Sequence, residues 1–361
     1  MLIPFLVIYY SEKEIWGEFV SILLFTLIAT QFINWGNKEY LLRTFSETPS
    51  RIKNTFSSNL ATRFPLVILF SIIAFFYFKL DYGIFIFLWL LGRFLIHCFE
   101  VLVVYEKKFI SSTIVETFCF LIFMLTFFYF KLDLNLKILL ILYSLYQLLK
   151  GLSYLFIYRN FILFNKVSFD FKYYTISFWF FLLSILGFLT SKIDVYIVDY
   201  FLNNEDLANY QIINSLLVFV MSISAFIYNP FIKNIYRINK DVVIKTKKIL
   251  LLLGALIVPV SILIIHFVLK YFLNLSFSVY FYIIAMFYVF PSFIYGIDIV
   301  TLFKQNQEKK VVVYLFFGIL INSIITSILL YYNFGLTGAM IGAMFSQALI
   351  LILLKVKSIK K

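Results

Sequence analysis

The chain has 361 residues, of which 63% are hydrophobic and 14% charged, and its mean hydropathy is +0.97. This composition excludes an ordinary soluble domain. The apolar runs last about 20 residues, the length of a membrane-spanning helix, whereas barrel strands alternate over about 10 residues. The net charge of +13 does not indicate nucleic acid, because no soluble basic domain exists to carry it. The sequence therefore predicts an all-α integral membrane protein.

The apolar runs, taken in chain order, predict twelve transmembrane helices. The first, Met1–Tyr10, is about half a span, and we expect it to be the end of a longer helix. Pro259 and Pro291 predict kinks in two later helices, because proline interrupts the helical hydrogen-bond ladder. The other eleven helices are expected at Ile15–Trp35, Phe64–Phe78, Ile84–Val104, Ile110–Phe130, Ile138–Tyr158, Tyr174–Asp199, Leu207–Phe231, Ile249–Val268, Phe277–Leu302, Val311–Tyr331 and Leu336–Leu354.

The polar links predict two pseudo-symmetric six-helix lobes. The link around 161–172 is the only polar one near the middle, so we divide the chain into lobes 1–160 and 173–361, joined by this cytoplasmic linker. A weak internal repeat supports the division, since Glu14–Phe19 aligns with Glu205–Tyr210 and each opens an apolar run. Related halves are common in transporters that alternate access.

Lysine and arginine give an independent indication of topology. With both termini in the cytoplasm, 23 of the 31 basic residues fall in inner links, five in outer links and three inside helices. The Gly36–Arg63 link and the link carrying Lys233, Arg237 and Lys240 are the richest of the inner ones. An excess of this kind marks the cytoplasmic side of a membrane protein.

No catalytic constellation is visible in the sequence. There is no glycine-rich phosphate loop and no C-x-x-C pair, and the short outer links leave no room for an extracytoplasmic catalytic domain. Cys98 and Cys119 lie inside apolar runs and are interpreted as small buried hydrophobes. His97 and His266 also lie within helices. We therefore expect neither an enzyme nor a cofactor or metal site.

The informative residues are charges placed deep in predicted helices. Arg93 and Lys150 lie near the midplane, where a cation is most costly, so we expect them to line a substrate cavity. Lys192 lies in the outer third of its helix and is a third candidate. The alternative is local neutralisation, of Arg93 by Glu100 or Glu116 and of Lys192 by Asp194.

Acidic and histidine side chains at similar positions are candidates for ion coupling or ion pairing. Arg93, His97 and Glu100 are spaced i, i+4 and i+7 and so share one helix stripe. Asp298, near the inner end of its helix, is expected to be hydrated. The sequence does not single out one proton carrier among the set, which comprises His97, Glu100, Glu116, Asp194 and Asp298.

Two stretches carry a resemblance to a known family. Ser191–Arg237 combines Asp194, an acidic turn with Ala208-x-Tyr210, and Pro230, and Gly335–Gly342 contains a G-x-x-G-A segment. This pattern resembles the bacterial oligosaccharide flippases of the multidrug/oligosaccharidyl-lipid/polysaccharide exporter superfamily. The resemblance implies a MATE-like fold. It also implies transfer of an undecaprenyl-pyrophosphate-linked oligosaccharide across the bacterial inner membrane, for O-antigen, capsule or a related glycan, by two lobes alternating around a cationic cavity.

Two other functions remain open on the sequence. A small-molecule antiporter of the same superfamily would export cations and favour carboxylates in its cavity, whereas Arg93, Lys150 and Lys192 are cationic. A membrane-embedded glycosyltransferase or polymerase would need a large outer loop. The partners implied by the leading interpretation are the lipid-linked oligosaccharide, membrane lipids and polysaccharide polymerase machinery, with no nucleic acid.

Overall fold

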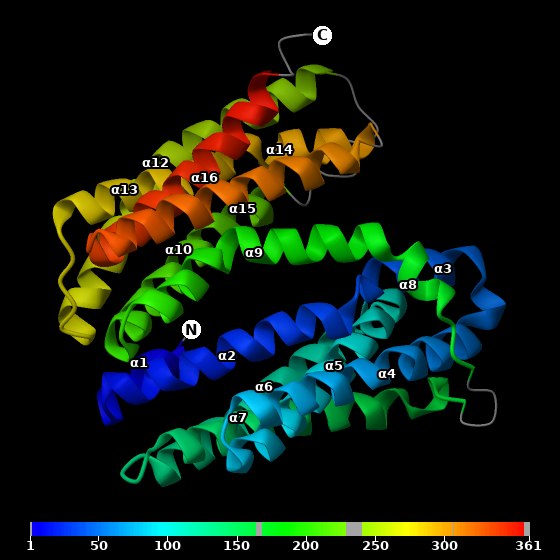
Figure 1. Ribbon diagram of the computed structural model, residues 1–361. Helices are drawn as coiled ribbons and strands as arrows, with labels where there is room; N and C mark the ends of the chain where they lie inside the picture. The colour runs from blue at the N-terminus through cyan, green and yellow to red at the C-terminus, as the bar shows by residue number, and fades with distance from the viewer. Residues whose placement is uncertain (1, 164–167, 229–239, 306, 357–361) are drawn as a thin grey trace. The chain divides into compact units, whose positions relative to one another are not determined.

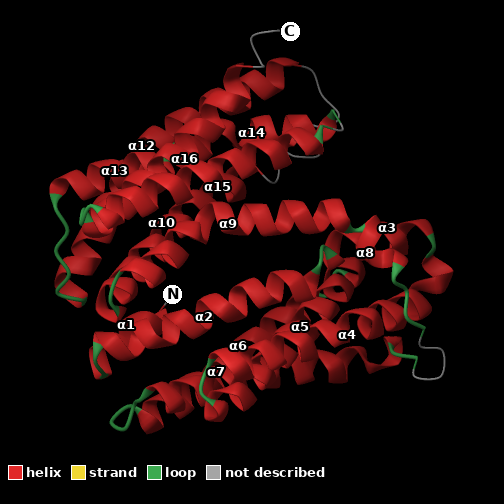
Figure 2. Ribbon diagram, in the orientation of Figure 1, coloured by secondary structure: helices red, strands yellow, loops and turns green. Residues whose placement is uncertain are grey.

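The computed structural model describes residues 2–163, 168–228, 240–305 and 307–356, and every regular element in these ranges is a helix (Figures 1 and 2). Within them, eleven helical segments are long and apolar enough to cross a membrane. These correspond in order to the eleven full-length helices predicted from the sequence. The all-α, multi-pass architecture is thereby confirmed.

Contacts divide the chain into two compact units. One, here called the N unit, is Ser21–Ile185; the other, the C unit, combines Met1–Val20 with Leu186–Lys361. Two helices, α2 (Lys13–Asn34) and α9 (Phe178–Phe201), have residues in both units.

The N unit is built on α5 (Leu80–Glu106), which packs along α7 (Leu136–Tyr158) and also contacts α4 (Ile52–Tyr77). Its buried residues include Trp89, Phe94 and Phe99. Large apolar side chains of α4 and α6 remain exposed, as expected for surfaces that face lipid. The remaining elements are α3 (Asn37–Glu47), η1 (Pro49–Arg51), α6 (Phe109–Phe130), η2 (Arg159–Phe161) and α8 (Lys172–Ile176).

In the C unit α15 (Glu308–Tyr331) and α16 (Gly335–Val356) form the most extensive helix pair. The other elements are α1 (Leu2–Tyr10), α10 (Asn204–Tyr228), α12 (Lys240–Phe272), α13 (Val279–Val289) and α14 (Pro291–Lys304). Pro259 lies inside the continuous α12, and Pro291 begins α14, with one residue between it and the end of α13. Pro230, Lys233 and Arg237, on which sequence predictions rested, lie outside the described residues.

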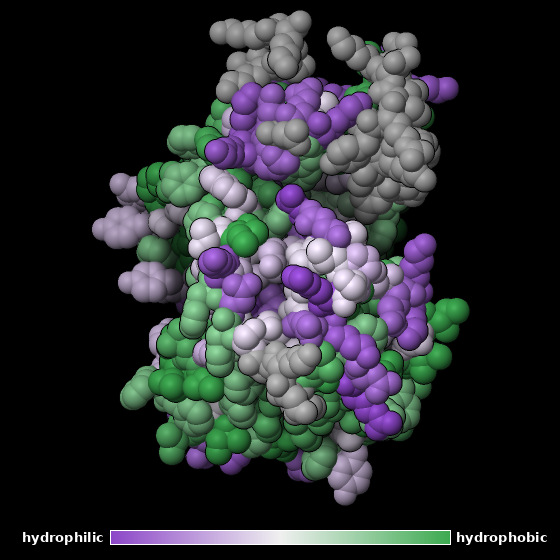
Figure 3. Space-filling view, turned by 90° about the vertical axis from the view of Figure 1, so that its right-hand side faces the viewer, coloured by the Kyte–Doolittle hydropathy of each residue, from purple (hydrophilic) through white to green (hydrophobic). Residues whose placement is uncertain are grey.

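The predicted polar link Gly36–Arg63 is largely helical. It contains α3 and the first turns of α4, so the predicted start of that helix at Phe64 is wrong and the helix begins at Ile52. α3 is amphipathic, with Leu41 and Phe45 fully buried. Polar side chains gather at the end of the N unit that carries α3 (Figure 3).

Arg63, counted above among the cytoplasmic cations, is fully buried inside α4. Its guanidinium donates to Asn59 Oδ1 at 3.0 Å, to the Ile33 carbonyl at 3.2 Å and to Cys98 Sγ at 2.9 Å. It therefore ties the last turn of α2 to α4 and α5, because the final carbonyls of a helix have no partner within the helix.

Links predicted on the same side of the membrane lie together within each unit. In the N unit, Ser58 Oγ lies 3.0 Å from Ser168 Oγ, and Asp81 pairs with Lys137 at 3.7 Å. In the C unit, Lys13 Nζ lies 3.6 Å from Glu205 Oε1. The two halves of the predicted repeat also meet there, since a Cβ on Gly17 would lie 1.9 Å from the Asn204 carbonyl oxygen. These contacts agree with the alternation on which the predicted topology depends.

Candidate functional site

A close crossing of α5 and α7 positions the deep charges of the N unit. A Cβ added to Gly92 would lie 2.4 Å from the Gln147 carbonyl carbon, and one added to Gly151 would lie 2.8 Å from the Gly92 carbonyl oxygen. Only glycine lets two helix backbones approach so closely. Arg93 and Lys150, each next to one of these glycines in the chain, are thus held beside the crossing.

The two carboxylates of the N-unit cluster both have cationic partners. Glu116 of α6 pairs with Lys150 of α7, whose side chain is 11% exposed. Glu100 pairs with Lys38 of α3 at 2.7 Å and also contacts His97 Nδ1 at 3.5 Å. A lysine so little exposed is rarely tolerated without a partner of this kind.

Arg93 has no direct ion-pair partner in the part of the chain that the structure describes. Glu100 and Glu116, the two carboxylates that the sequence suggested for it, form their direct ion pairs with Lys38 and Lys150. Both carboxylates still attract the Arg93 guanidinium at longer range. Arg93 therefore shares these two carboxylates with two other cations, and neither carboxylate forms a salt bridge with it.

The C unit has a separate polar cluster on α9 and α10. Asp194 is 1% exposed and accepts hydrogen bonds from the Tyr210 hydroxyl at 2.5 Å and from Asn214 Nδ2 at 3.1 Å. Lys192 Nζ donates to Asn214 Oδ1 at 2.7 Å. The direct Lys192–Asp194 pair that the sequence suggested is replaced by one in which Asn214 lies between the two charges.

The same cluster extends toward α2. Trp16 Nε1 donates to Gln211 Oε1 at 3.2 Å, and Gln211 Nε2 donates to Ser215 Oγ at 3.1 Å. Gln211, Asn214 and Ser215 were not among the residues singled out from the sequence. Their spacing was the available signal, because Asn214 and Ser215 follow Gln211 by three and four residues, and residues at these spacings share a helix face.

The remaining candidates have different surroundings from those expected. Asp298 is 9% exposed and pairs with Lys247, so the expectation that it is hydrated is wrong. The His266 ring packs edge-on against Tyr282 at 4.9 Å. Cys98 and Cys119 are free and buried, and no group of three or more metal-binding side chains occurs in the ranges described above.

The helices and their buried charges define a multi-pass membrane protein with a MATE-like fold. No protein-family model matches the chain, and no curated protein matches it in sequence. Two solved structures share its fold. One is the lipid II flippase MurJ in an inward closed conformation, with a TM-score of 0.72 and 14% identity, over 100% of this chain and 85% of that one. The other is a multidrug resistance MATE family transporter of the MOP superfamily, inward-facing, with a TM-score of 0.63 and 12% identity, over 99% and 92%.

Proposed function

We propose that this chain is a flippase that carries a polyprenyl-diphosphate-linked oligosaccharide across the bacterial inner membrane for surface polysaccharide synthesis. The fold shared with a lipid II flippase supports this assignment. The observation that carries it is Arg93, a half-buried cation beside the α5–α7 crossing whose expected partners are bound elsewhere.

A half-buried cation without a direct ion pair suits an anionic substrate for a physical reason. The interaction between two charges grows as the surrounding dielectric constant falls, so a diphosphate gains far more beside Arg93 than it would in water. Lys150 can contribute only while its pair with Glu116 is loosened or shared. We therefore place Arg93 first in diphosphate binding and give Lys150 and Lys192 supporting roles.

Small-molecule antiport is the second candidate. The MATE transporter shares the fold, and the side-chain hydrogen bonds to the buried Asp194 carboxylate come from two neutral groups, Tyr210 and Asn214. A carboxylate of this kind suits the exchange of a cation. This function predicts that cells producing the protein resist cationic dyes, whereas a flippase leaves their sensitivity unchanged.

The test of the flippase is complementation of surface-glycan synthesis in a strain lacking its own flippase. Arg93→Gln should lower glycan output at least about tenfold. Arg93→Lys should retain most of the output, because the site requires a positive charge and not the planar set of hydrogen-bond donors of a guanidinium. Lys53→Gln, which removes an exposed cation of α4, is the matched control and should behave as wild type.

Protein in the membrane is quantified for each variant by immunoblot. Full complementation by Arg93→Gln at normal protein level would reject the role of Arg93. Failure of the wild-type chain to support any glycan export, with increased dye resistance, would favour the antiporter instead.

A further inference from the structure

A hollow of about 480 Å³ opens in the N unit where α3, the start of α4 and residues 168–173 meet. Its volume lies within the range typical of small-molecule sites. The elements around it all belong to links predicted on the cytoplasmic side. Its walls are formed by Tyr40, Thr44, Thr48, Arg51, Asn54, Thr55, Ser58, Asn59, Ser168, Phe169, Asp170 and Tyr173.

The wall of this hollow is polar but electrically balanced. Arg51 and Asp170 are its two charged residues, and hydroxyl and amide side chains supply most of the rest. That balance contrasts with the net charge of +13 carried by the whole chain. Hydroxyls can both donate and accept hydrogen bonds, as can amides, so such a wall matches a neutral ligand that is rich in hydroxyl groups.

Aromatic rings provide an apolar surface beside these polar groups. The Tyr40 and Tyr173 rings meet edge to face at 4.9 Å, and Phe169 on the rim is 60% exposed. The Tyr173 hydroxyl donates to the Trp35 carbonyl oxygen at 2.8 Å, which holds the ring in place. A sugar ring has an apolar face of C–H groups and a polar edge of hydroxyls, and this combination of rings and hydroxyls is complementary to both.

One wall residue is buried and held in a fixed orientation. Asn59 is 4% exposed, and its Oδ1 accepts from Arg63 Nε at 3.0 Å. Its side chain also forms a hydrogen bond with the Tyr173 hydroxyl. These bonds link the polar part of the wall to its aromatic part.

We propose that this hollow binds a neutral sugar ring, and that it holds the glycan head of the lipid-linked substrate on the cytoplasmic side before transfer. The second half of this statement rests on the proposed function. The first half does not, because a free saccharide presents the same chemistry to the hollow.

The full chain in detergent is tested by saturation-transfer difference NMR with a panel of neutral hexoses, deoxyhexoses, N-acetylhexosamines and their disaccharides. Two variants act at exposed wall positions: Asn54→Trp fills the hollow and Phe169→Ala removes the rim ring. Phe109→Ala is the matched control, because Phe109 is 55% exposed and does not line the hollow.

The expected result is saturation transfer to at least one saccharide with wild type and Phe109→Ala. With Phe169→Ala, affinity should fall about tenfold, the loss of one well-placed aromatic contact, and with Asn54→Trp the signal should vanish. No transfer to any panel member, or equal transfer with wild type and Asn54→Trp, would overturn the assignment.

A second arm identifies the source of the sugar. Glycan export is measured by the complementation assay for the same variants. Loss of export with Asn54→Trp but not with Phe109→Ala identifies the lipid-linked glycan as the ligand. Normal export together with lost saccharide binding identifies a free saccharide and overturns the docking role. Failure of wild type to export glycan contradicts the proposed function, while the NMR arm still decides on the sugar site.

Discussion

Asn214 is placed between two charges that lie two residues apart on α9. Its carbonyl oxygen accepts from Lys192 and its amide nitrogen donates to Asp194, so one neutral side chain satisfies both an ammonium and a carboxylate. The Tyr210 hydroxyl adds a second donor to Asp194. Taking a carboxylate out of water is costly unless donors replace the water, and α10 supplies them.

Removing Asn214 should therefore be more damaging than removing a neighbouring polar group. We expect Asn214→Ala to lower the free energy of unfolding by about 1–3 kcal/mol, because it leaves the buried Asp194 carboxylate and the half-buried Lys192 ammonium each short of a partner. Ser215→Ala, which removes only the longer 3.4 Å contact to Lys192 and the bond from Gln211, should have a smaller effect. Thermal denaturation of the purified protein in detergent measures both, and equal losses would contradict the bridging role.

The sequence located the important charges but not their partners. Depth along a helix can be counted, and this is why Arg93, Lys150 and Asp194 could be singled out. Which side chains meet depends on the neighbouring helix and on rotation about its axis, neither of which spacing reveals. Lys38 reaches Glu100 from α3, an element that the hydropathy pattern did not predict at all.

At the scale of elements, the α5–α7 crossing depends on two glycines. The Gln147 backbone lies where the Cβ of any other residue at position 92 would have to be. Because backbone atoms cannot rotate away as a side chain does, the helices would have to separate. The same crossing holds Arg93 and the Lys150–Glu116 pair, so its geometry bears on the proposed substrate path.

Gly92→Ala should lower the free energy of unfolding by about 1–3 kcal/mol, the usual cost of overpacking, and should reduce glycan export as well. The matched control is Gly187→Ala in α9, where an added Cβ meets no atom within 4 Å. Melting temperature in detergent and complementation are measured for both variants. A Gly92→Ala protein as stable and active as Gly187→Ala would show that the crossing tolerates separation.

The ends of the elements were harder to predict than their existence. The apolar stretch after Phe64 identified a membrane span, but α4 begins at Ile52 because its first turns bury Phe56 and Ser57 against protein rather than lipid. A hydropathy pattern identifies segments that are apolar enough to lie in the bilayer. A polar helix outside the bilayer has no such signal and is therefore predicted as a connecting link. Pro291 illustrates the opposite case, since its missing N–H marks the boundary between α13 and α14 in the sequence itself.

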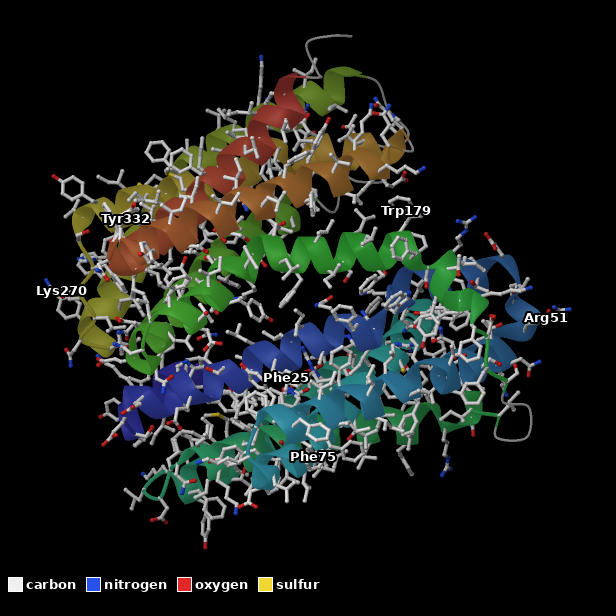
Figure 4. All side chains as sticks on the ribbon, viewed as in Figure 1. Phe25, Arg51, Phe75, Trp179, Lys270 and Tyr332 are labelled. Carbon is white, nitrogen blue, oxygen red and sulfur yellow. The ribbon has the colours of Figure 1, made fainter. Side chains whose placement is uncertain are left out.

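At the scale of the whole molecule, the distribution of lysine and arginine and the contacts between links agree with each other. Lys13 and Glu205 come from links assigned to the same side, as do Asp81 and Lys137. In Figure 4, Lys270 and Tyr332 lie at the same end of the C unit, although 62 residues separate them in sequence. If the predicted number of spans between two such residues were wrong by one, the two residues would lie at opposite ends of the unit.

Sidedness itself is tested by cysteine labelling in intact cells. Cys98 and Cys119 are first replaced by serine; at position 98 the serine keeps an acceptor for Arg63. Single cysteines are then introduced at three exposed positions, Lys53, Lys270 and Tyr332. Because basic links stay in the cytoplasm, an impermeant maleimide should label Lys270→Cys and Tyr332→Cys from outside. Lys53→Cys should react only after the membrane is permeabilised. Labelling of Lys53→Cys in intact cells, with the other two protected, would invert the topology and place the proposed sugar site on the outer face.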